Sequence, residues 1–264
     1  MKRLLTPLAL VFAALLASGA GKVRLTDATG SGLAAFGRHA FDYATKHGVE
    51  FAYFRLEVSA ALEKLALGET DVVLLNGADL PKDFSGGKTV CAYRPLVAVV
   101  SLRNPVRGIT RDRLKRLLAE PQPDWSFAGI SGMPVRRAAL RSDAGGPAGI
   151  AQLKLFRSAP GILLLGSLDQ LWTFVGPNPA ALAVAPFGGD LPDGLAALKI
   201  DGVAPTRAAV RSKTYPLTEE FCAVTAAEPP KAVRELVAGF GTRDFSDLLE
   251  EEGALAPLPG AAEN

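Results

Sequence analysis

The sequence predicts an α/β fold, and three observations support it. The 264 residues alternate between short β-rich runs and stretches in which apolar residues recur at helical spacing, the pattern of a sheet covered by helices. Hydrophobic residues make up 48% of the chain and charged residues 21%, which is enough apolar material for a core and argues against disorder. The length suits one large domain or two lobes.

The first twenty residues have the organisation of a secretory signal peptide. Lys2 and Arg3 precede an uncharged apolar run over 4–17, and small residues follow up to Ala20. The run is shorter than the ~20 residues that span a bilayer comfortably. We expect cleavage near Ala20, with an uncleaved membrane anchor as the alternative. No cysteine follows the run, which excludes a lipoprotein anchor.

The next part of the chain predicts a βαβαβ unit. Its elements are expected at 23–26 (strand), 33–47 (helix), 49–56 (strand), 59–67 (helix) and 71–75 (strand). Ser59 is the expected N-cap of the second helix, and Gly68 the residue that ends it. Such alternation implies a parallel sheet with helices on its faces.

The rest of the chain continues the alternation. Strands are expected at 96–101, 134–139, 162–165, 182–185, 198–200 and 219–225, and helices at 109–118, 150–156, 167–175, 231–240 and 245–252. Thr110 is the expected N-cap of the first of these helices. The segment 202–212 is expected to be a loop. The acidic run 244–252 predicts a solvated face of the last helix.

Composition excludes several classes of function. The formal net charge is +2, and removal of Lys2 and Arg3 leaves 27 basic against 27 acidic residues, which gives no basic stripe for nucleic acid. Two cysteines exclude a disulfide scaffold and a cysteine-rich zinc site, although Cys91 and Cys222 could pair in an oxidising compartment. Two histidines argue against a multi-histidine metal centre. We expect no metal, no cofactor and no enzyme activity, because no activated nucleophile or phosphate loop is visible.

Several conspicuous side chains have plain structural explanations. His39 and His47 lie on or beside the first helix, where surface positions are expected. Trp125 is an expected core residue. Arg136 and Arg137 are neighbours on a strand, so their side chains point to opposite faces and only one of them can face a site.

Three loops that open helices, at 30–32, 58–60 and 144–149, could together bind an anion. The N-terminus of a helix presents free backbone N–H groups and the positive end of the helix dipole. Glycine in such a loop lets the backbone approach a ligand closely. Arg141, just before the third loop, adds a planar charge. A single loop of this kind most often reflects turn chemistry, so the combination carries the prediction.

The order of the segments resembles the substrate-binding proteins of phosphate ABC transporters, which are periplasmic binding proteins with a type 2 domain. The matching segments are 62–72, 76–79, 93–100, 104–106, 109–114, 125–126, 200–206 and 214–217. The most specific pieces are the last two, which include Asp201-Gly202 and Tyr215-Pro216-Leu217. Together the segments extend over essentially all of 22–255.

This resemblance implies a two-lobed Venus-flytrap fold, in which each lobe is a mixed sheet flanked by helices. Lobe I is expected to consist of 22–98 and 219–264, and lobe II of 102–213. Hinge strands are expected near 97–101 and 215–225. An anion would be held between helix N-termini of the two lobes.

The resemblance also implies site residues. The expected ligand-binding residues are Gly30, Ser31, Gly32, Ser59, Asp79, Arg141, Asp143, Gly145 and Gly146. Asp79 matches an acidic residue of the family that can accept a hydrogen bond from a protonated phosphate. Gly145 and Pro147 stand where the family has hydroxyl residues, and Leu33 and Ala34 follow the first loop where it normally has another. A charge-assisted hydrogen bond contributes roughly 1.5–3 kcal/mol, so two such losses could weaken phosphate binding about a hundredfold.

Two functions therefore remain open. The first is a monomeric periplasmic solute-binding protein that delivers phosphate or a related oxyanion to an ABC permease. The second is a degenerate domain of the same fold that acts as a sensor or protein-interaction module without tight phosphate binding.

Overall fold

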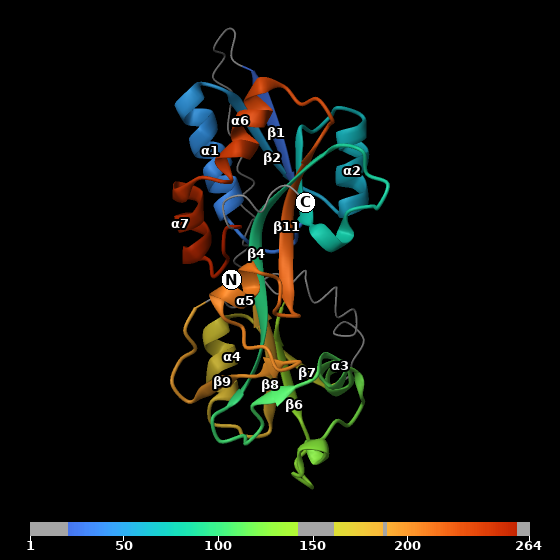
Figure 1. Ribbon diagram of the computed structural model, residues 1–264, viewed down its shortest axis with the longest axis vertical. Coiled ribbons are helices and arrows are strands. Elements are labelled where there is room, and N and C mark those ends of the chain that lie inside the picture. Colours follow the sequence, from blue (N-terminus) through green and yellow to red (C-terminus); the bar gives the residue numbers. More distant parts are fainter. Residues whose placement is uncertain (1–20, 142–160, 187–188, 258–264) are drawn as a thin grey trace, which may run out of the picture.

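One strand, β4 (Gly87–Ser101), runs through both halves of the molecule. The computed structural model describes residues 21–141, 161–186 and 189–257, which form two lobes with β4 extending from one into the other (Figure 1). The strand order is β2-β1-β3-β11-β4-β8-β6-β7, and β9 pairs beside β4. The expected signal peptide, the helix expected at 150–156 and the loop at 144–149 lie outside the described residues.

Lobe I contains the strands β1 (Lys22–Asp27), β2 (Glu50–Arg55), β3 (Val72–Asn76) and β11 (Thr218–Thr225). Parallel pairing joins β1 to β2 and β3, whereas β11 lies antiparallel between β3 and β4. Four helices cover the two faces, namely α1 (Ala35–His47), α6 (Lys231–Gly239) and α7 (Arg243–Glu251) on one and α2 (Val58–Ala66) on the other.

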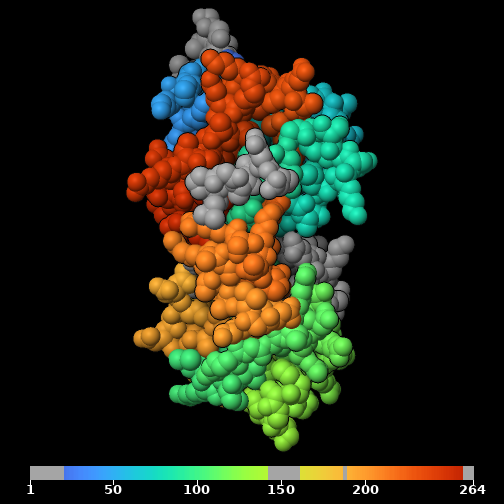
Figure 2. Space-filling model, in the orientation of Figure 1, coloured from blue at the N-terminus to red at the C-terminus, as the bar shows by residue number. Residues whose placement is uncertain are grey.

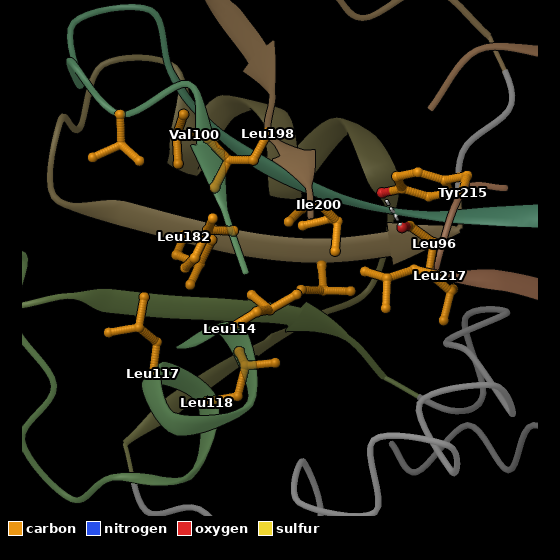
Figure 3. Close-up of a cluster of buried hydrophobic side chains, with 14 of the residues drawn as sticks. Leu96, Val100, Leu114, Leu117, Leu118, Leu182, Leu198, Ile200, Tyr215 and Leu217 are labelled. Carbon is orange, nitrogen blue, oxygen red and sulfur yellow. Dashed lines mark hydrogen bonds between the residues drawn. The ribbon is translucent and has the colours of Figure 1, made fainter. Parts of the chain in front are cut away.

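Lobe II contains the strands β6 (Arg136–Leu140), β7 (Ile162–Leu165), β8 (Ala181–Pro186) and β9 (Leu195–Ala197). The helix α3 (Arg111–Ala119) packs on one face and α4 (Leu168–Val175) on the other. Smaller elements are the strands β5 (Gly108–Ile109) and β10 (Lys199–Ile200), the helix α5 (Arg207–Arg211), and the 3₁₀ turns η1 (Gly77–Asp79) and η2 (Ser126–Ala128). Leucines from α3, β4 and β8, together with Leu198 and Leu217, fill the core between α3 and the lobe II sheet (Figure 3).

The chain passes between the lobes twice, at two adjacent places. Pro95 pairs with Thr218 in the lobe I sheet, and the next residue, Leu96, pairs with Pro186 in the lobe II sheet. The Leu96 amide donates to the Leu217 carbonyl at 2.8 Å. The Tyr215 hydroxyl donates to the Leu96 carbonyl at 2.9 Å, as Figure 3 shows. These contacts tie the two crossings together.

A surface contact also links the lobes. Glu250 of α7 accepts from Arg207 at 3.0 Å and from Arg211 at 3.4 Å, both on α5. Figure 2 shows the α5 segment lying across the junction next to α7 on this face. The lobe ranges given above stay a prediction.

The predicted α/β fold is confirmed, and most elements lie where the spacing placed them. The strands β5 and β9 were not expected from the sequence, and three further details differ. β4 begins at Gly87 and not at residue 96, because its first half pairs with β11, far away in sequence. A short helix, α5, lies within the expected loop, capped by Thr206. α2 begins at Val58 after the extended residue Glu57, so the N-cap prediction for Ser59 is wrong, whereas that for Thr110 is confirmed.

Trp125, Arg136 and Arg137 differ in how far their side chains are buried. Trp125 is fully buried, and its indole Nε1–H donates to the Ala180 carbonyl at 3.1 Å. Arg136 is exposed, whereas Arg137 is buried and donates to the carbonyls of Leu118 and Glu120 at 2.9 and 2.8 Å. Arg137 therefore stabilises the C-terminal end of α3.

His39 is not the surface residue that was expected. Its ring packs against Phe240 and Phe245, with centroids 5.1 and 5.2 Å apart, in the angle between α1 and the C-terminal helices. Burial lowers the pKa of His39. His47 is exposed and stacks on Tyr43.

The cysteines are free thiols on opposite faces of the lobe I sheet. Cys91 packs in the core under α1, and Cys222 packs in the core under α2. A β-bulge between Phe221 and Cys222 shifts the register here, so that Cys222 pairs with Val90. The structure therefore excludes the disulfide that the sequence left open.

Candidate functional site

The carboxyl ends of the parallel strands in both lobes face the crossing. In lobe II, β8 ends at Pro186, opposite Leu96, and β6 runs parallel to it. In lobe I, β3 ends at Asn76, opposite Phe221 near the start of β11, and β1 runs parallel to β3. Loops that follow such strand ends are where open α/β sheets bind ligands.

The first loop is held together by its own polar side chains. Gly30 and Gly32 have φ values of 57° and 72°, a left-handed conformation that glycine adopts without strain. The Thr29 hydroxyl is 2.6 Å from Asp27 Oδ1, to which it donates, and 2.8 Å from the Ser31 hydroxyl. With the Thr29 proton committed to Asp27, the Ser31 proton is directed at Thr29. Ser31 is 2% exposed, so its hydroxyl supports the loop from inside.

Beneath this loop lies a buried ion pair between β4 and β11. Arg94 Nε donates to Glu219 Oε2 at 2.7 Å, and Arg94 Nη1 donates to the Ser31 carbonyl at 3.0 Å. The guanidinium also lies over the Phe221 ring, 5.2 Å from its centroid. Within the described chain, Arg94 Nη2 and Glu219 Oε1 are buried without a hydrogen-bond partner. Sequence reasoning missed both residues.

Asn76 adds a further buried polar group on the same face of the sheet. It lies opposite Phe221, and Glu219 is two residues from Phe221, so the three side chains share a face. Its Oδ1 accepts from the Ala78 amide at 3.1 Å, which starts η1. Among the described residues, Asn76 Nδ2 is buried without a partner.

The amino end of α1 is occupied by a carboxylate of the same chain. Ala34 is the N-cap residue and offers no side-chain cap. The Ala35 amide instead donates to Glu252 Oε2 at 3.2 Å, and Arg38 Nη2 pairs with Glu252 Oε1 at 2.7 Å. The acidic run at 244–252 is therefore only partly the solvated face that was expected.

In lobe II, Arg141 follows β6 directly. Its amide donates to the Leu165 carbonyl at 2.9 Å, which extends the pairing with β7. The guanidinium lies beside Gly166, where an added Cβ would be 3.6 Å from Nη2. Ser167, the next residue, is the N-cap of α4. Arg141 is exposed at the edge of lobe II that faces the crossing.

The remaining expected site residues are spread over neighbouring elements. Ser59 is exposed in the first turn of α2, and Asp79 is exposed on η1. Asp143, Gly145 and Gly146 lie outside the described residues. Ligand binding by any of these residues stays a prediction. In the part of the chain that the structure describes, no group of three or more His, Cys, Asp or Glu residues could hold a metal.

Comparison with solved structures supports the two-lobed fold. An ABC-type phosphate transport receptor from Vibrio cholerae superposes with a TM-score of 0.78 and 17% identity, covering 89% of this chain and 100% of its own. PstS from Borrelia burgdorferi superposes with a TM-score of 0.76 and 18% identity, covering 90% of this chain and 99% of its own. No family model matches the sequence, and no curated protein matches it. At these identities the likeness establishes the fold: a two-lobed periplasmic-binding-protein architecture.

Proposed function

We propose that this chain is a periplasmic solute-binding protein of an ABC importer, which binds phosphate or a phosphate-like oxyanion between its lobes and catalyses no reaction. The fold is that of a phosphate transport receptor along nearly the whole chain. The sequence resemblance to phosphate-binding proteins, found segment by segment, points the same way. Its expected partner is the importer's permease.

The single observation that carries the proposal is the position of Arg141. It lies at the carboxyl end of β6, beside the amino end of α4, on the edge of lobe II that faces the crossing. A guanidinium and a helix N-terminus are each suited to an oxyanion, and a bidentate arginine contact adds geometric selectivity. The first loop of lobe I faces the same crossing.

The proposal also covers the cellular location, oligomeric state and lobe boundaries of the protein. The predicted signal peptide would export the chain, and in the described residues no helix is long and apolar enough to cross a membrane. We propose a monomer without nucleic-acid partners, with lobe I at 22–98 and 219–264, lobe II at 102–213, and hinge strands near 97–101 and 215–225. Besides Arg141, the proposed ligand contacts are Gly30, Ser31, Gly32, Ser59, Asp79, Asp143, Gly145 and Gly146.

Calorimetric titration tests the proposal. Purified protein without its signal peptide is titrated with phosphate, sulfate, molybdate and a phosphonate, alongside Arg141→Ala and the control Arg136→Ala, an exposed arginine at the other end of β6. We expect binding of at least one anion, about a hundredfold or more weaker in Arg141→Ala, and unchanged in the control. Absence of heat with all four anions at millimolar concentration contradicts the proposal.

One observation favours the second function, a sensor or interaction module without tight phosphate binding. Two donors at the amino end of α1 and in the loop before it already have partners within the chain. The Ser31 hydroxyl is bonded to Thr29, and the Ala35 amide donates to Glu252. This function would be favoured if wild type and Arg141→Ala capture the same partner equally well from a periplasmic extract and the titrations show no binding heat.

A further inference from the structure

The contact between Glu252 and α1 joins two distant parts of the chain. Glu252 follows α7, which lies beside α1 in Figure 1. Its Oε2 accepts from the Ala35 amide at 3.2 Å, and its Oε1 pairs with Arg38 at 2.7 Å. Ala35 is the first residue of a thirteen-residue helix that has no side-chain cap of its own.

A carboxylate at this place is subject to the same electrostatics as an oxyanion ligand. The first amides of a helix lack partners within the helix, and the dipole favours negative charge there. Two further donors lie on the same face of the lobe I sheet: Arg94 Nη2 and Asn76 Nδ2 are buried and, among the described residues, unpartnered. Arg94 reaches the loop directly through the Ser31 carbonyl. Lobe I thus has the donors of an anion site, and one of them is taken by Glu252.

We propose that Glu252 is an internal anion that occupies the amino end of α1, and that an oxyanion must displace it to bind lobe I. This inference rests on the proposed function. The displacement is possible because Arg38 is exposed, so the Glu252 carboxylate can swing outward and keep this cation beside it. Arg38 also pairs with Glu251 at 3.2 Å. Because two anions at one amide repel each other, Glu252 lowers affinity, most strongly for dianions.

The test compares three single variants by calorimetric titration with inorganic phosphate at fixed pH and low salt. Glu252→Gln keeps the shape and removes the charge, and Glu252→Ala removes the contact. Glu251→Gln is the matched control, because it removes an equal charge from the same arginine without touching the Ala35 amide. We expect phosphate to bind at least about tenfold tighter to both Glu252 variants, and within twofold of wild type to Glu251→Gln.

A gain in affinity cannot arise from misfolding, so a lower melting temperature of Glu252→Ala leaves the test valid. Equal binding by wild type and the Glu252 variants, with binding lost in Arg141→Ala, overturns this inference and leaves the proposed function standing. An equal gain in Glu251→Gln overturns it too, since the effect would then be one of net charge. If neither wild type nor any of the three variants gives binding heat with phosphate or the other anions, both this inference and the proposed function are overturned.

Discussion

Arg94 and Glu219 face each other across β4 and β11, 125 positions apart in sequence, with 2.7 Å between Nε and Oε2. Their side chains are 4% and 0% exposed, so the pair is removed from water at the point where the chain leaves lobe I. Desolvation of two charges offsets most of their attraction, so an intact buried pair adds little net stability. Loss of one partner leaves the other charge buried alone, which is strongly destabilising.

Replacement of one member of this pair should therefore cost more stability than replacement of both. We expect Arg94→Met to lower the free energy of unfolding by about 3–5 kcal/mol, and Arg94→Met with Glu219→Leu to recover most of that loss. Urea unfolding curves of the two single variants and the double variant measure the difference. Additive losses in the double variant would contradict this account.

Arg137 should contribute strongly to the stability of lobe II, whereas its neighbour Arg136 should contribute little. Its guanidinium donates to the carbonyls of Leu118 and Glu120 at the end of α3, and the residue is 3% exposed. We expect Arg137→Met to lower the free energy of unfolding by about 2–4 kcal/mol. Arg136→Met, an exposed change on the same strand, should have an effect within about 0.5 kcal/mol. Similar losses in both variants would argue against a capping role.

His39 should make stability depend on pH below neutrality. Burial lowers its pKa, although a hydrogen bond to the backbone of Leu236 and the charges of Asp42 and Asp244 act in the opposite direction. Near pH 7.5 the imidazole is neutral in both states. As the pH falls through the unfolded value of about 6.5, the unfolded chain takes up the proton first, so stability is lost until the folded pKa is reached.

Denaturant unfolding at pH 7.5 and 5.5 measures this effect. We expect His39→Gln to lose less stability than wild type between the two values. His47→Gln, at an exposed position, should lose as much as wild type. An identical pH dependence in all three proteins would show that carboxyl groups alone account for it.

The two thiols should not react with thiol reagents in the folded protein. Both are buried, and burial raises their pKa values, that of Cys222 to about 12. We expect no reaction with an aromatic disulfide reagent in buffer and two reactive thiols per chain in denaturant. Dithiothreitol should leave the melting temperature unchanged. A drop in melting temperature on reduction would mean that the cysteines pair after all.

Local pattern was sufficient for most elements, because apolar spacing and turn residues act over a few positions. It placed Ile162–Leu165 as a strand and Thr110 as an N-cap correctly. The first half of β4 was missed because Lys88, Arg94 and Pro95 interrupt the apolar run there. α5 is five residues long, too short to show a helical period.

The site was harder to predict, for a physical reason. Arg94 and Glu252 act through partners 125 and 217 positions away, and no local pattern reports such a distance. An arginine before a proline gives no sign that it is buried, and a glutamate at the end of an acidic run resembles a solvated residue. Ser31 was found from its glycine neighbours, but the direction of its proton depends on Thr29 and Asp27.

The position of β11 between β3 and β4 has a consequence for how the chain folds. A polypeptide that emerges from its N-terminus delivers β3 and β4 long before β11, with the whole of lobe II between them. Until residue 225 arrives, β3 and β4 each keep an open edge, a template for pairing with other chains. Lobe I therefore cannot complete its sheet until β11 has been made, and until then the partly made chain exposes these two edges to other chains.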